Sequence, residues 1–259
     1  MKSKSKQVVI ISGTSSGIGK ALKELYERDG HTVVGLCRSA EAPDIAVDVT
    51  DGEAVKKAVD EVYARYGRID TVIANAGGGL SGATELLPKE AVRTQMELNF
   101  DGALNLVKSA LRYTEKGGRA IFISSACALF ALPFRAMYCA SKAAVNMAAF
   151  GLYMELKPLG IRVSAVCPGD IKTNFTANRV KYGDGGDRYG DRPQKAADKI
   201  DRHEDKRMKL PKAAKKIYKC CNKCKKPLYI VGFKYKALNF LRHILPQKLF
   251  LNMTAKLFG

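Results

Sequence analysis

The chain has 259 residues, of which 46% are hydrophobic and 27% are charged. A chain of this length and composition buries enough apolar surface to fold without disulfides or a structural metal. With 23 Gly and 9 Pro, it fits neither the collagen-like nor the Pro-rich disordered class. No apolar run approaches the ~18 residues that span a bilayer, and the basic N-terminus lacks the apolar core of a signal peptide. We therefore expect a globular protein of the cytoplasm, without a transmembrane segment.

Short β-rich runs alternate with longer amphipathic patterns along the first two thirds of the chain. The runs predict strands at residues 7–12, 31–36, 45–48, 69–74, 119–124 and 161–167. The amphipathic patterns between them predict helices at residues 17–29, 52–66, 88–114 and 136–157. Nearly continuous apolar strands joined by helical crossovers indicate a parallel sheet that is covered on both faces. The predicted fold class is α/β, a doubly wound parallel sheet (Rossmann fold) flanked by helices.

The alternation of strands and helices stops after Gly169. Residues 178–209 are polar and predict a lid or an insertion, and residues 228–231 predict one more strand. Residues 235–245 and 247–258 form two amphipathic patterns split by Pro246. Packing on the domain is favoured for these helices, while closing a pocket, pairing subunits and weak peripheral membrane contact stay open. We predict one domain over residues 1–259, with a cofactor and catalytic core at 7–173 and a substrate lid, last strand and helical extension at 174–259.

The formal net charge of +19 is concentrated near the end of the chain. Residues 171–259 hold 23 Lys and Arg against seven Asp and Glu, and residues 211–226 carry seven lysines and no acidic residue. Such a segment attracts polyanions or forms the solvated face of a helix, and the solvated face is the favoured interpretation. Apart from Tyr218, no aromatic residue interleaves the lysines as a single-strand stacking surface requires. We predict no specific nucleic-acid partner.

Seven cysteines, an odd number, are typical of a reducing compartment. Cys221 and Cys224 have the spacing of metal ligands, but no second pair of Cys or His stands at a matching distance. We therefore predict no metal site. Four other cysteines lie in apolar segments and are expected to be small core residues, namely Cys37, Cys127, Cys139 and Cys167.

A glycine-rich turn, Gly13 to Gly19, follows the first predicted strand and opens the first predicted helix. Glycines let the backbone approach a pyrophosphate, and the helix N-terminus offers free N–H groups. A glycine-rich turn alone is weak evidence, but this position at the first strand–helix junction predicts a dinucleotide site. Arg38 follows the second strand, where an acidic residue would accept hydrogen bonds from a ribose 2′-hydroxyl. A guanidinium instead binds a 2′-phosphate, so the sequence favours NADP(H) over NAD(H).

Tyr138 and Lys142 are four residues apart near the start of the long predicted helix, which places them on one helical face. A free Tyr has a pKa of about 10, and a nearby cation favours its ionised form. Such a Tyr can exchange a proton with an alcohol or carbonyl oxygen. By itself, this pair is also common on ordinary helix surfaces.

Together with other motifs, the pair makes residues 7–173 closely resemble the short-chain dehydrogenase/reductase family. The only departures are conservative: Ser12 replaces the usual Thr, and Ala74 replaces a frequent Asn. The matching motifs occur in the family's order and are Gly13-x-x-x-Gly17-Ile-Gly19, Asp48-Val49, Asn75-Ala-Gly77, Asn99, Ser124-Ser125, Tyr138-x-x-x-Lys142 and the run from Pro168 to Thr173.

The resemblance implies a role for each catalytic residue. Tyr138 is the general acid or base, and Lys142 holds the nicotinamide ribose and lowers the pKa of Tyr138. Ser125, in preference to Ser124, bonds the substrate oxygen, while Asn99 kinks its helix and anchors a water. The implied cofactor-binding residues are Gly13, Ser15, Ser16, Gly17, Ile18, Gly19, Arg38, Asp48, Val49, Asn75, Ala76, Gly77, Tyr138, Lys142, Pro168, Gly169, Ile171 and Thr173.

The resemblance implies an NADP(H)-dependent oxidoreductase that interconverts a ketone or aldehyde and an alcohol by hydride transfer, as a homodimer or homotetramer. Residues 228–232 and 245–250 resemble the hydroxysteroid and retinol dehydrogenase-like branch, which implies a lipophilic, steroid-like substrate. Phe130, Leu132, Pro133 and Phe134 fit either an apolar pocket wall or ordinary core packing.

Two alternatives remain open at this point. One is a 3-oxoacyl thioester reductase. The other is a non-catalytic cofactor-binding interaction protein with a polyanion-binding basic tail, although a protein without catalysis has no need of the Asn, Ser, Tyr and Lys set.

Overall fold

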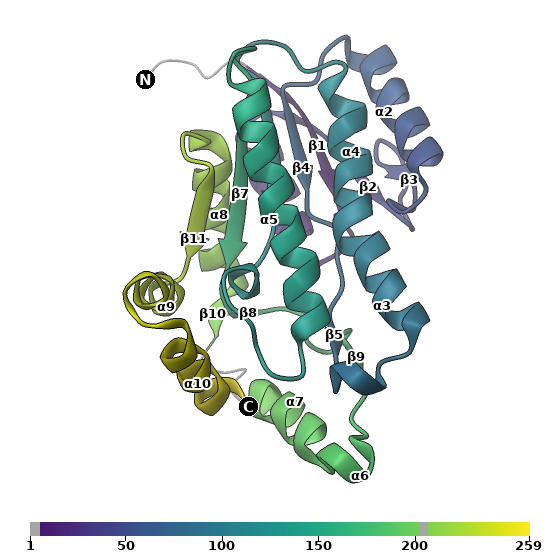
Figure 1. Cartoon of the computed structure of the whole chain (residues 1–259). Helices are drawn as coiled ribbons and strands as arrows, with labels where there is room; N and C mark the ends of the chain where they lie inside the picture. Colours follow the sequence, from purple (N-terminus) through teal and green to yellow (C-terminus); the bar gives the residue numbers. More distant parts are fainter. Residues whose placement is uncertain (1–5, 203–206) are drawn as a thin grey trace.

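A seven-stranded parallel sheet forms the centre of the structure, a computed structural model that describes residues 6–202 and 207–259 (Figure 1). Its strand order is β11-β7-β6-β4-β1-β2-β3. Each of the seven predicted strands lies in this sheet, with ends that differ from the prediction by at most two residues, and the predicted doubly wound fold is confirmed. The strands are β1 (Val8–Ser12), β2 (Thr32–Cys37), β3 (Ile45–Ala46), β4 (Thr71–Ala74), β6 (Arg119–Ile123), β7 (Arg162–Pro168) and β11 (Leu228–Val231).

Helices cover both faces of the sheet, because successive strand residues point to opposite sides and are apolar on both. Val8 and Ile10 of β1 face a core that includes α2 (Gly52–Tyr66), α4 (Gly102–Leu111) and α5 (Ala136–Leu156). Val9 and Ile11 face the other core, built with α1 (Gly17–Arg28) and α8 (Leu210–Lys223). Both faces of the strands are therefore buried, which is what their unbroken apolar runs predicted.

The helical region predicted at residues 88–114 has three parts. It begins as α3 (Lys89–Met96), widens into the π-helical turn η2 (Glu97–Asp101) and continues as α4. Such turns are frequent at functional sites. Here the turn contains Asn99, so the irregularity expected at this residue is present.

The basic segment at residues 211–226 forms most of α8 and the loop after it. Ala214, Ile217 and Cys221 are buried against α1, while the lysines of the segment are exposed to solvent. Cys224 is buried in the same core, so Cys221 and Cys224 serve as apolar packing residues. The segment is thus an amphipathic helix with a solvated basic face, the interpretation that the sequence favoured.

The rest of the last third lies over the carboxyl edge of the sheet. β8 (Ile171–Lys172) pairs with β10 (Met208–Lys209), and β9 (Val180–Lys181) pairs with β5 (Leu80–Ser81). The polar segment between β9 and β10 contains α6 (Gly186–Tyr189) and α7 (Arg192–Arg202). Two helices, α9 (Phe233–Ile244) and α10 (Gln247–Phe258), follow β11. Within the described ranges, no helix is long and apolar enough to cross a membrane.

Candidate active site

A cavity of about 590 Å³ lies at the carboxyl ends of the strands. The strand order reverses between β1 and β4, and ligands of open parallel sheets bind at such a reversal. Segments that follow β1, β2, β4, β6 and β7 all reach the cavity, because the carboxyl ends of parallel strands share one edge. Every predicted site residue except Gly19 and Asn99 lines it.

The glycine-rich turn has a backbone that favours glycine at Gly13, Gly17 and Gly19. Gly13 and Gly17 have φ values of 71° and 58°, a backbone region that favours glycine. A Cβ on Gly19 would lie 2.1 Å from the Gly13 carbonyl oxygen. Ser16 precedes α1 without a side-chain cap, and no acidic residue stands in the first helical turn. The N–H groups of α1 are therefore available to an anion, and the cradle fits a pyrophosphate.

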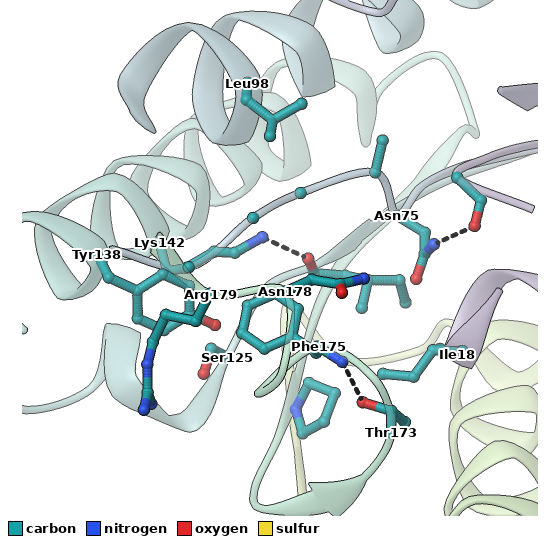
Figure 2. Close-up of a pocket in the computed structure, with 18 of the residues that line it drawn as sticks. Ile18, Asn75, Leu98, Ser125, Tyr138, Lys142, Thr173, Phe175, Asn178 and Arg179 are labelled. Atoms are coloured by element: carbon teal, nitrogen blue, oxygen red, sulfur yellow. Dashed lines mark hydrogen bonds between the residues drawn. The ribbon is translucent and has the colours of Figure 1, made fainter. Parts of the chain in front are cut away.

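Asn75 fixes this turn against the end of β4. Its Nδ2 donates to the carbonyl oxygens of Ser12, at 2.9 Å, and Gly13, at 3.2 Å. In return, the Ser12 Oγ accepts hydrogen bonds from the backbone N–H groups of Asn75 and Ala76. Asn75 lines the cavity and also holds the turn in place (Figure 2).

Arg38 and Asp48 lie together at the far end of the cavity. The backbone N–H and Oγ1 of Thr50 donate to Asp48 at 2.9 and 2.8 Å. The backbone hydrogen bond of Thr50 is the main cause that lowers the pKa of Asp48, and the charge of Arg38 lowers it further. Because Arg38 is exposed beside this carboxylate, its guanidinium is free to reach a phosphate at the cavity mouth.

Tyr138, Ser125 and Lys142 project into the opposite end of the cavity (Figure 2). Tyr138 and Lys142 come from the first turns of α5, and Ser125 comes from the loop after β6. The Ser125 side chain lies beside that of Tyr138 and lowers its pKa, and the centre of the Tyr138 ring lies 5.8 Å from that of Phe175 (Figure 2). Lys142 Nζ donates to the carbonyl oxygen of Ile123 at 3.3 Å. The hydroxyls of Tyr138 and Ser125 and the ammonium of Lys142 thus line the same end of the cavity (Figure 2).

Asn99 lies behind the cavity and is fully buried. Its Oδ1 accepts from the N–H of Gly78 at 2.9 Å, and its Nδ2 donates to the carbonyl oxygen of Gly78 and to Ser141 Oγ, both at 3.0 Å. A Cβ on Gly77 would lie 2.8 Å from Asn99 Oδ1 and 3.2 Å from Lys142 Nζ. Gly77 therefore leaves the space in which Asn99 and Lys142 come close, and Asn99 acts as a positioning residue.

Burial governs the electrostatics of the Tyr138 and Lys142 pair. It raises the pKa of Tyr138 above the ordinary value and lowers the pKa of Lys142 to about 8. The cation that favours ionised Tyr138 is Arg135, whose Cζ lies 5.0 Å from the centre of the Tyr138 ring. Lys142 Nζ is directed to the Ile123 carbonyl oxygen, and the expectation that Lys142 lowers the pKa of Tyr138 stays a prediction.

The substrate end of the cavity contains residues that the sequence did not place there, including Cys127, which was expected in the core and is instead half-buried at the cavity wall. Arg207 donates to Thr176 Oγ1 at 2.5 Å and to the carbonyl oxygen of Ile200 at 2.6 Å. No motif marks these positions, because they come from separate segments that only the path of the last third brings together. The lining residues of this kind are Cys127, Arg135, Phe175, Arg179, Arg207 and Tyr235.

None of the four residues that the sequence offered as a pocket wall lines this cavity. Phe130 and Leu132 are buried in a core cluster with Leu238 and Phe250. Pro133 and Phe134 are half-buried, and Phe134 packs edge-on against Tyr189. Core packing, rather than the wall of the catalytic cavity, is the observed role of Phe130 and Leu132.

Comparison with known proteins agrees with the fold. Residues 7–182 match the sequence model of the short chain dehydrogenase family. Since the match covers more than half of the chain, the protein belongs to the short-chain dehydrogenase/reductase family, as the motifs predicted. Its class is that of oxidoreductases acting on CH–OH and keto groups.

Individual relatives extend the likeness beyond the family motifs. The chain is 39% identical over 180 residues to the 3-ketodihydrosphingosine reductase of Bacteroides thetaiotaomicron, with 67% of each chain covered. It is 27% identical over 272 residues to dehydrogenase/reductase SDR family member 7B of Rattus norvegicus, covering 96% of this chain and 81% of the relative. The crystal structure of a short-chain dehydrogenase from Streptomyces avermitilis superposes with a TM-score of 0.80 at 28% identity, over 96% of both chains. These last two likenesses include the variable last third.

Proposed function

We propose that this protein is an NADP(H)-dependent oxidoreductase that interconverts a lipophilic ketone or aldehyde and its alcohol, with Tyr138 as the acid or base. One observation carries the proposal. The side chains of Tyr138 and Ser125 lie beside each other at one end of a cavity whose other end holds the glycine-rich turn and Arg38 (Figure 2). A dinucleotide laid along this cavity has its phosphates at the turn and its reactive ring beside the two hydroxyls.

Different residues along the cavity bind the different parts of the cofactor. A bound nicotinamide cofactor supplies or accepts the hydride. The N–H groups at the start of α1 hold the pyrophosphate, and Asp48 and Val49 flank the adenine. Ile171 and Thr173 stand at the carboxamide end, and Lys142 holds the nicotinamide ribose.

Tyr138 and Ser125 provide the proton transfer and the charge stabilisation. Because burial raises its pKa, Tyr138 holds its proton in neutral solution and can donate it to a carbonyl oxygen during reduction. Ser125 supplies a second donor to the same oxygen, and two fixed donors stabilise negative charge as it develops there. The Arg135 guanidinium favours the phenolate that remains. In the oxidation direction the same phenolate accepts the proton of the alcohol.

The proposed preference for NADP(H) rests on Arg38, whose guanidinium can bind the 2′-phosphate of the cofactor. Replacing Arg38 by Asp restores the acidic residue that accepts from a ribose 2′-hydroxyl and repels the phosphate. We expect the native protein to have the higher kcat/KM with NADPH and Arg38→Asp to have the higher value with NADH. Arg65→Asp, a charge reversal on α2 away from the cavity, should leave the preference unchanged. A native protein that prefers NADH contradicts this assignment.

The lipophilic substrate is supported by two observations. A relative with 39% identity is a reductase of 3-ketodihydrosphingosine, a long-chain ketone. In addition, Phe175, Tyr235 and Ile200 give the substrate end of the cavity an apolar lining. The steroid-like compounds implied by the end of the sequence belong to the same lipophilic class.

A second candidate, reduction of a 3-oxoacyl thioester, is favoured by the cations at the substrate end. Arg135 and Arg207 border the cavity there, and a thioester of coenzyme A carries phosphates that guanidiniums bind well. The oxidation of NADPH in the presence of 3-ketodihydrosphingosine, ketosteroids, 3-oxoacyl-coenzyme A and simple ketones decides between the two candidates.

Tyr138→Phe tests the proposed chemistry. Loss of the acid should lower kcat by about 10²–10⁴-fold on whichever substrate is turned over. Binding of NADPH, measured by calorimetry, should change little, because the phenol is distant from the phosphate cradle. Tyr63→Phe, on the outer surface of α2, is the matched control. Turnover near the native level in Tyr138→Phe would dispose of the mechanism, and cofactor binding without turnover of any carbonyl compound by the native protein would favour a non-catalytic role.

A further inference from the structure

The two C-terminal helices leave a band of large apolar side chains in solvent. In α9, Phe233, Phe240 and Ile244 are 88%, 65% and 57% exposed, and in α10 Leu249 and Leu257 are 54% and 48% exposed. Of the 13 large hydrophobic residues exposed in the part of the chain that the structure describes, six belong to these two short helices. Single exposed apolar residues are ordinary, but a concentration of this kind marks an interaction surface.

The exposed residues of α9 form one stripe. Phe233, Phe240 and Ile244 are separated by seven and four residues, a spacing that keeps them on one helical face. The opposite face buries Tyr235 and Leu238 in the core. The helix is therefore apolar on two sides, and residues 6–202 and 207–259 cover only one of them. A helix of this kind needs a second apolar environment for its outer side.

The surroundings of the stripe are basic. Residues 206–259 contain 15 Lys and Arg and no Asp or Glu. Lys234, Lys236 and Arg242 of α9 are exposed, and so are Lys248 and Lys256 of α10. Asp29 accepts from Tyr218 of α8 and Asp170 accepts from Tyr235 of α9, and α7, which packs against α10, carries Asp198. The outer surface thus combines exposed aromatic and aliphatic groups with cations.

We propose that α9 and α10 dock onto an anionic lipid surface. The exposed Phe, Ile and Leu side chains enter the boundary between headgroups and acyl chains, and the neighbouring lysines and arginines contact the anionic headgroups. A second copy of the chain suits this face poorly, because a two-fold interface places the same patch on both subunits and would oppose like charges. A nucleic acid would satisfy the cations but leave the apolar stripe in water.

The buried face of α9, opposite the exposed stripe, borders the substrate end of the cavity. Tyr235 of α9 lines the cavity, and Lys199 of α7 donates to the carbonyl oxygens of Lys256, at 3.1 Å, and Gly259, at 2.8 Å. A lipid surface at α9 and α10 therefore lies close to where a lipophilic ketone would enter. This consequence for substrate delivery rests on the proposed function, whereas the docking itself does not.

Sedimentation of the purified full chain with vesicles tests the docking. We expect binding to vesicles of phosphatidylcholine and phosphatidylglycerol in equal amounts, weak binding to phosphatidylcholine alone, and a decrease as salt is raised. Phe233→Ser/Phe240→Ser should weaken binding to the mixed vesicles by about tenfold or more, because two large apolar groups no longer insert. Met147→Ser/Met154→Ser is the matched control, since these α5 residues are similarly exposed, at 68% and 67%, and should leave binding unchanged.

Three results would overturn the docking. They are absence of binding to the mixed vesicles at low salt, equal loss in both double variants, and an oligomer in vesicle-free buffer that only Phe233→Ser/Phe240→Ser dissociates. The last result would assign the stripe to a second copy of the chain. Circular dichroism confirms that each variant is folded. Turnover of a water-soluble ketone without vesicles is measured separately, so failure of the proposed function and failure of the docking are told apart.

Discussion

Replacing Lys142 by Met is predicted to give a more stable and inactive protein. Lys142 is only 4% exposed, and burial lowers its pKa from 10.5 to about 8. At about 1.4 kcal/mol per pH unit, this difference corresponds to about 3 kcal/mol that the folded protein loses by keeping the ammonium charged. Methionine has a similar length and no charge, so Lys142→Met should raise the free energy of unfolding by up to about 3 kcal/mol near neutral pH.

The pH dependence has a definite sign. The folded-state pKa of Lys142 lies below its unfolded value, so the unfolded chain binds the proton more tightly between about pH 8 and pH 10.5. The stability penalty is fully present below about pH 8 and disappears as the pH rises toward 10.5. The advantage of Lys142→Met over the native protein should therefore shrink steadily across this window.

Urea unfolding followed by circular dichroism at neutral and alkaline pH measures both effects. Lys57→Met, at an exposed position on α2, is the control and should change stability by less than about 0.5 kcal/mol. Turnover should fall in Lys142→Met, because the group proposed to hold the ribose is gone. A Lys142→Met protein that is less stable than the native one at neutral pH would refute the reasoning, since the bond to the Ile123 carbonyl would then outweigh the cost of burial.

Two further predictions concern other parts of the cavity. Gly19→Ala should weaken NADPH binding by about tenfold or more and destabilise the fold by about 1–3 kcal/mol, because its Cβ would lie 2.1 Å from the Gly13 carbonyl oxygen. Calorimetry and urea unfolding measure the two effects, and native affinity would show that the turn is not the cradle. The hydrogen bond from Cys139 lowers the pKa of Cys127 to about 6, so alkylation of Cys127 by iodoacetamide should rise through about pH 6 and level off near neutrality. Peptide mapping follows it, and a rate that still climbs steeply above about pH 8 would contradict this assignment.

The sheet was predictable because its strands carry a strong and simple signal. Strands buried on both faces are unbroken apolar runs, and residues such as Gly30 and Pro168 punctuate them clearly. Parallel strands also place their carboxyl ends on one edge. For this reason, the motifs around Gly13, Asn75 and Ser125 were expected to meet, although they are far apart in the chain, and they line one cavity.

The substrate end was not predictable, because no local pattern encodes it. Arg135, Arg179 and Arg207 reach the cavity from three segments, and their approach depends on how residues 171–209 cross the sheet edge. The electrostatics of Tyr138 were missed for a related reason. Spacing on α5 shows that Lys142 shares a face with Tyr138, but it does not show that burial dominates both groups or that Arg135 lies over the ring.

The two ends of the cavity are held by different kinds of structure, and this difference bears on specificity. The phosphate cradle and the Tyr138 region are fixed by buried strands, by Asn75 and by the π-helical turn around Asn99, so few substitutions there leave the chemistry intact. The substrate end depends on short strand pairs and on side-chain bonds such as those of Arg207 with Thr176 and Tyr235 with Asp170. Those contacts can change without disturbing the sheet. Under the proposed function, the sheet edge therefore sets the hydride and proton steps, and the last third of the chain sets the choice of carbonyl compound.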